Sequence, residues 1–73
     1  MSQLPVLSGK EIVSALLKIG YYEVRQRGSH IRLACERKRS VTVPDYKTVS
    51  RGLLRKIVRD ADLSPDDFIR LLD

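Results

Sequence analysis

The sequence predicts an α+β fold: a helix, a three-stranded antiparallel sheet, a second helix and a short C-terminal helix, with the helices packed on one sheet face. Three observations support it. Apolar residues recur at helical spacing in the first and last thirds of the chain, polar and apolar residues alternate between them, and serines that can cap helices precede the helical segments. With 73 residues, the chain is expected to form one domain over residues 1–73.

The first helix is expected over residues 9–19. Ser8 and Glu11 have the spacing of a capping box, in which each side chain accepts a hydrogen bond from the other residue's backbone. Gly20 can adopt the left-handed conformation that ends a helix. Between these signals, apolar residues recur at helical spacing, namely Ile12, Val13, Leu16, Leu17 and Ile19.

Residues 21–43 show the two-residue period of strands. In the first strand, 21–27, one face is expected to carry Tyr22, Val24 and Gln26, so that the strand is half-exposed. A turn is expected at 28–29. The second strand begins at His30, and its apolar face is expected to hold Ile31, Leu33 and Cys35. Residues 36–39 are all charged and predict a turn, while 40–43 predict a third strand that Pro44 ends.

Two further helices are expected after a polar connection over residues 45–49. Ser50 can cap the second helix, whose apolar stripe comprises Leu53, Leu54, Ile57, Val58 and Ala61. Its opposite face carries Arg51, Arg55, Lys56 and Arg59. Ser64 and Pro65 begin a short helix over about 65–72, which is expected to bury Phe68, Ile69, Leu71 and Leu72.

The distribution of charge points to a polyanionic partner. The formal net charge is +5, but residues 25–59 hold eleven Lys and Arg against two carboxylates, while residues 60–73 carry a net charge of −4. Clustered cations of this kind are typical of nucleic-acid binding, because phosphate contacts release condensed counterions. The alternative is a solvated charged surface without a dedicated ligand.

Several classes of protein are disfavoured by composition. No apolar run reaches the length of about 20 residues that a membrane helix needs, and no secretion signal is recognisable, so a cytoplasmic protein without membrane contact is expected. Cys35 and His30 are the only cysteine and histidine, which leaves no set of soft ligands for a metal. No cofactor is therefore expected.

The segment from Arg25 to His30 is the best candidate for chemistry. It places the only imidazole directly after a Gly28–Ser29 turn and among arginines. An imidazole can remove the proton from a ribose 2′-hydroxyl or protonate a 5′-oxygen leaving group, while guanidinium groups neutralise charge on the phosphate. The candidate catalytic residue is His30, and the candidate RNA- and phosphate-binding residues are Arg25, Arg27, Gly28, Ser29, Arg32 and Lys47.

Other interpretations of these residues remain open. From composition alone, His30 is more simply an ordinary polar residue on the exposed face of a strand. A second proton-transfer group is not identifiable, with Tyr46, Lys47 and water as the candidates. The chain could also be a non-catalytic RNA-binding module, or a small interaction protein whose basic surface docks an acidic partner.

Taken together, several motifs resemble the HicA family of toxin–antitoxin mRNA interferases. The resemblance covers almost the whole chain, and its sharpest part is the run that ends in Gly28, Ser29 and His30. The matching segments are residues 8–11, 17–21, 24–30, 41–44, 52–57 and 60–64.

The resemblance implies a fold and a function. The fold would be similar to the double-stranded-RNA-binding domain. The activity would be metal-independent cleavage of mRNA by an endoribonuclease toxin that inhibits translation and growth, with His30 as the catalytic imidazole and Gly28–Ser29 as its supporting turn. The implied partners are the mRNA substrate and a HicB-type antitoxin that blocks the site, with oligomers possible within their complex.

Overall fold

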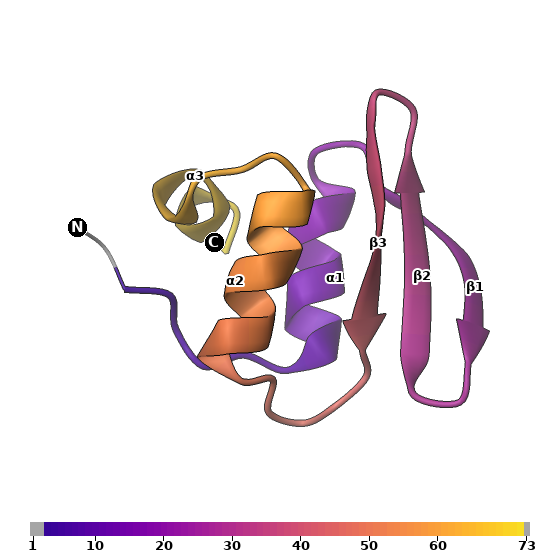
Figure 1. Ribbon diagram of the computed structural model, residues 1–73, viewed down its shortest axis with the longest axis horizontal. Coiled ribbons are helices and arrows are strands. Elements are labelled where there is room, and N and C mark those ends of the chain that lie inside the picture. Colours follow the sequence, from indigo (N-terminus) through magenta and orange to yellow (C-terminus); the bar gives the residue numbers. More distant parts are fainter. Residues whose placement is uncertain (1–2, 73) are drawn as a thin grey trace.

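The computed structural model describes residues 3–72 and contains three helices and three strands in that part of the chain. In chain order they are α1 (Gly9–Leu17), β1 (Tyr22–Arg27), β2 (His30–Cys35), β3 (Lys38–Pro44), α2 (Arg51–Asp60) and α3 (Pro65–Arg70). The strands form one antiparallel sheet in the order β1-β2-β3. The predicted α+β fold is confirmed, with α1 and α2 lying side by side against one face of the sheet (Figure 1).

The helix starts agree with the capping signals. Ser8 and Glu11 form a complete capping box at α1, and Ser50 and Ser64 accept hydrogen bonds from backbone N–H groups at the starts of α2 and α3. The regular part of α1 ends at Leu17, two residues before the predicted end, and Gly20 follows with a φ of 106°. Residues 71 and 72 lie beyond the last helical residue of α3.

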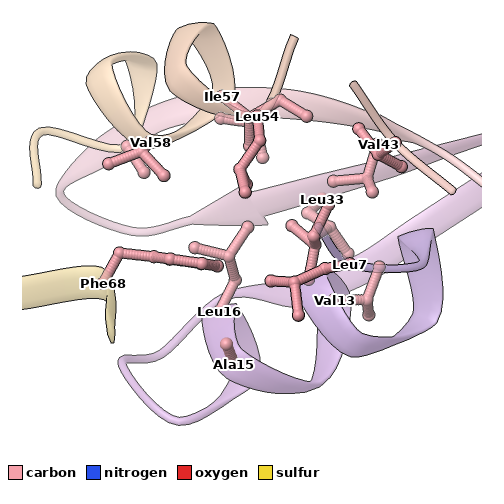
Figure 2. Packing of buried hydrophobic residues seen from close by; sticks show 14 of the residues in the cluster. Leu7, Val13, Ala15, Leu16, Leu33, Val43, Leu54, Ile57, Val58 and Phe68 are labelled. Carbon is pink, nitrogen blue, oxygen red and sulfur yellow. The ribbon is translucent and has the colours of Figure 1, made fainter. Parts of the chain in front are cut away.

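One hydrophobic core lies between the helices and the sheet (Figure 2). β2 supplies Ile31 and Leu33 to it, as the alternation predicts, and Cys35 is partly buried against its edge. The core also includes residues that the sequence did not single out as buried, among them Leu4, Tyr21 and Val49. Val49 pairs with Leu7 in an isolated antiparallel bridge, so the connection predicted to be polar is in fact anchored to the N-terminal segment.

β1 differs most from expectation. All six of its residues are exposed, so the prediction of a half-exposed strand is wrong. The physical reason is its position at the edge of the sheet, where the helices, which pack on β3, do not reach (Figure 1). Tyr22 and Val24 are accordingly 57% and 54% exposed.

The turn between β2 and β3 is shorter than predicted. β3 begins at Lys38, because Lys38 pairs with Cys35 and extends the ladder through residues that have little intrinsic preference for strands. Only residues 36 and 37 remain in the turn. The Lys38 ammonium donates a hydrogen bond to the carbonyl oxygen of Ala61 at the end of α2 (3.0 Å) and ties this end of the sheet to the helix layer.

Candidate active site

The sheet face opposite the helices is open and carries most of the predicted site. Residues paired directly across two strands lie on the same face. Because Ile31 and Leu33 point into the core, their neighbours His30 and Arg32 lie on the open face. Arg27 pairs with His30, and Arg25 pairs with Arg32, so the open face also receives both arginines of β1.

A β-bulge in β1 turns Glu23 away from this face. The register shifts between Glu23 and Arg25, which leaves Val24 as the extra residue. Strict alternation would place Glu23 and Arg25 on the same face. Instead, Glu23 pairs with core-facing Leu33, while Arg25 pairs with Arg32 on the open face. The predicted grouping of Tyr22, Val24 and Gln26 on one face is therefore wrong, since Gln26 pairs with core-facing Ile31 and Tyr22 with Ala34.

The turn between β1 and β2 holds His30 at one end of the sheet. Gly28 has a φ of 54°, which suits the first central position of a two-residue hairpin turn of type II′. The Gln26 side-chain amide donates a hydrogen bond to the Gly28 carbonyl oxygen (3.1 Å) and steadies the turn. An added Cβ at Gly28 would meet no atom within 4 Å, so its left-handed backbone, rather than crowding, favours glycine here.

The polar groups of the open face are accessible. His30, Arg25 and Arg27 are exposed, and within residues 3–72 their side chains make no ion pair or hydrogen bond. Arg32 donates a hydrogen bond from Nη1 to the Thr42 hydroxyl (2.9 Å) on the neighbouring strand. Three guanidinium groups thus lie on the same face as the imidazole, and a phosphate placed over this face would find several cationic donors.

The segment after β3 folds back beside the turn. The Asp45 N–H donates to the Ser29 carbonyl oxygen (2.6 Å), and the Gly9 N–H donates to the Tyr46 carbonyl oxygen (2.9 Å). A side chain at Gly9 would collide with the Pro44 carbonyl, so glycine is required for this close approach. The start of α1, the β1–β2 turn and the end of β3 therefore meet at one end of the molecule (Figure 1).

A recess lies at this meeting point. It encloses about 260 Å³ and is lined by Ser8, Lys10, Asp45, Tyr46 and Lys47. A larger groove of about 560 Å³ between α1 and the sheet shares Lys10 and Asp45 with it and extends to Gln26 and Ile31. Lys47 thus lines the recess beside the turn, apart from the arginines that share the sheet face with His30.

Sequence reasoning missed three residues of this site. Thr42 orients Arg32, while Lys10 and Asp45 line both the recess and the groove. Thr42 had a usable signal, since it is the polar residue between Val41 and Val43 in a strand and must face away from the core. The sequence carries no such signal for Lys10 and Asp45, because the contact between the end of β3 and α1 brings them together.

Metal-binding clusters and membrane-spanning helices are both absent from the described part of the chain. Between residues 3 and 72, no group of three or more His, Cys, Asp or Glu side chains is placed to hold a metal ion. None of the helices in that range is both long and apolar enough to cross a membrane.

Comparison with protein families identifies the chain. The open sheet face combines three arginines with an exposed imidazole beside a glycine turn, which suits an anionic ligand. A family model for the HicA toxin of bacterial toxin–antitoxin systems matches residues 9–63. The chain therefore belongs to the HicA toxin family, which confirms the resemblance and assigns a toxin that acts with an antitoxin. No match was found among curated proteins.

Proposed function

We propose that this protein is a metal-independent endoribonuclease that cleaves mRNA with His30 as its acid–base residue. The observation that carries the proposal is the position of His30, exposed on the same open sheet face as Arg25, Arg27 and Arg32. Membership of a toxin family gives such an activity a biological purpose, since cleavage of mRNA in the cytoplasm stops translation and growth.

The chemistry is transesterification within the RNA chain. The imidazole of His30 removes the proton of a ribose 2′-hydroxyl, and the 2′-oxygen forms a bond to the adjacent phosphorus. The bond from phosphorus to the 5′-oxygen breaks, and that oxygen receives a proton from an acid group. The products are a 2′,3′-cyclic phosphate and a 5′-hydroxyl. Arg25, Arg27 and Arg32 stabilise the additional negative charge on the phosphate, and Tyr46, Lys47 or water supplies the second proton transfer.

The test is cleavage of a labelled single-stranded RNA in excess EDTA. Wild type is expected to cut it, and His30→Ala is expected to cut it at least about 100-fold more slowly, the range for loss of a general acid–base group. Arg70→Gln, an exposed change on α3, is the matched control and should cut like wild type. End-group analysis should find 2′,3′-cyclic phosphate. A folded wild type that shifts RNA in a gel without cleaving it would instead support the non-catalytic RNA-binding module.

We also propose that a HicB-type antitoxin inhibits the toxin by covering His30. The open face is cationic, so the covering surface should be acidic to match it. In the purified complex, diethyl pyrocarbonate should modify His30 much more slowly than in the free toxin. Equal rates in the two samples would rule out direct blocking of the site.

A further inference from the structure

A second group of basic residues lies at the other end of the sheet. Arg37 in the β2–β3 turn, Arg39 in β3 and Arg59 in the last turn of α2 form what we call the distal basic cluster. They line a cavity of about 410 Å³ together with Lys38, Asp60 and Asp62. In Figure 1 the β2–β3 turn and the end of α2 lie at one end of the molecule, and the β1–β2 turn lies at the other.

The two lysines near this cavity are already engaged. Lys38 donates to the Ala61 carbonyl oxygen, and Lys56 forms an ion pair with Asp60 at 2.9 Å. The hydrogen bond from Lys56 is the main reason why the pKa of Asp60 is lowered, with Arg59 and Arg39 contributing through their charges. Asp60 is therefore charged and locally balanced by Lys56.

The arginines, in contrast, are available. Within residues 3–72, the guanidinium groups of Arg37, Arg39 and Arg59 make no hydrogen bond or ion pair. Among residues 3–72, Asp62 is the only other carboxylate that lines the cavity, so the three arginines exceed the charge that remains to oppose them. Guanidinium groups bind phosphate oxygens in pairs, and three of them around one cavity suit an anionic backbone better than a single carboxylate.

We propose that the distal basic cluster is a second phosphate-binding site, which holds the RNA substrate at a distance from the bond that is cut. This rests on the proposed function. β2 leads from His30 to Cys35, next to the turn, and at about 3.4 Å per residue this distance is roughly 17 Å. With the axial spacing of about 3.4 Å per phosphate along one strand of B-DNA as the reference, this distance corresponds to about five nucleotides. The cluster favours substrates that extend well beyond the cleaved bond.

The test measures binding of a 12-nucleotide single-stranded RNA in a His30→Ala background, where cleavage is expected to be at least about 100-fold slower. Arg37→Gln with Arg59→Gln is compared with Arg55→Gln with Arg70→Gln, which removes the same charge elsewhere on the helices. One phosphate contact contributes about 0.7 to the slope of log K against log salt. Loss of two contacts should therefore make the slope less steep by about 1.4 and weaken binding about 10- to 30-fold at 0.1 M salt. The control pair should leave both the slope and the affinity unchanged.

A second variant tests the cluster in the opposite direction. Asp62→Asn removes the opposing carboxylate, and asparagine tolerates the left-handed backbone of this position. It should tighten RNA binding about two- to fivefold at low salt, an effect that screening removes at high salt. Equal losses in both arginine pairs, together with no gain from Asp62→Asn, would overturn the distal site and leave the proposed function intact. If the His30→Ala protein without further changes binds no RNA, and wild type cleaves none, the proposed function fails with it.

Discussion

At the scale of single residues, Asp62 is the most unusual backbone position. Its φ is 60°, and it is the only residue other than glycine with a positive φ in the described part of the chain. The N–H of Asp62 donates to the Arg59 carbonyl and that of Leu63 to the Val58 carbonyl, which is the hydrogen-bond pattern of a Schellman motif. Glycine is preferred at this point because it has no Cβ to clash.

Asp62→Gly is therefore expected to stabilise the protein. The gain in free energy of unfolding should be about 0.5–1 kcal/mol, because relief of the left-handed strain exceeds the extra flexibility of glycine when unfolded. Chemical denaturation would measure it. Asp62→Ala keeps the Cβ without the polar group and should lower stability. A glycine variant less stable than wild type would show that contacts of the carboxylate outweigh the strain.

Gly28 is the second residue with an unusual backbone conformation. Its φ of 54° turns β1 into β2 directly before His30. Gly28→Ala should cost about 1–2 kcal/mol of stability through strain alone, since an added Cβ meets no neighbouring atom. Gly52→Ala is the control: Gly52 is the second residue of α2 with equally open surroundings, and alanine should stabilise the protein by up to about 1 kcal/mol. Similar changes in melting temperature for the two variants would contradict this account.

At the scale of elements, one buried hydroxyl joins the start of the sheet to β3. The Tyr21 hydroxyl donates a hydrogen bond to the Arg39 carbonyl oxygen (2.8 Å), while its ring lies in the core. Burial is the main cause that raises the pKa of the Tyr21 phenol above its usual 10.0, and negative charge at Cys35, Asp60 and Asp62 adds to it. The fold thus favours the neutral phenol.

This shift predicts a loss of stability in alkali. Because the folded-state pKa of Tyr21 is raised, the neutral phenol contributes to the free energy of unfolding. This contribution is complete below pH 10.0 and disappears as the pH rises through the folded-state pKa. Tyr21→Phe should cost about 1 kcal/mol at neutral pH and flatten the alkaline part of the stability curve. Tyr22→Phe is a matched control, since Tyr22 is exposed and should leave the curve unchanged. An identical alkaline slope in wild type and Tyr21→Phe would refute the assignment.

The sequence predicted the types and order of the helices and strands. It did not predict the exposure of β1 or which of its residues share a face. Ser8, Ser50 and Ser64 act through bonds to residues three positions away, so a local pattern was enough to place the helix starts. The bulge at Val24 depends on how β1 pairs with β2, and no local pattern encodes it. For the site, His30 and the turn were recognisable, whereas Lys10 and Asp45 meet only through contacts between distant segments.

At the scale of the whole molecule, the two faces of the sheet differ. The helices cover one face and bury the core there, while the other face is open and carries His30 with the arginines of β1. α3 belongs to the helix-covered side, and Figure 2 shows Phe68 reaching from α3 toward Leu16 of α1. Phe68 is 0% exposed, although it lies beyond residue 63, where the match to the toxin family ends. The core of this chain therefore includes a part that the family model does not cover.

Phe68→Ala should consequently destabilise the entire domain. Removal of a fully buried phenylalanine costs about 3–5 kcal/mol, and a core of this size rarely yields more than that in total. A large fraction of the variant should be unfolded at 37 °C, and circular dichroism should show the helices and the sheet lost in one transition. Leu17→Ala, at a position that is 48% exposed, should change stability by less than about 0.5 kcal/mol. A Phe68→Ala protein that melts like wild type would mean that α3 is an appendage, and that the core needed to present His30 is complete without it.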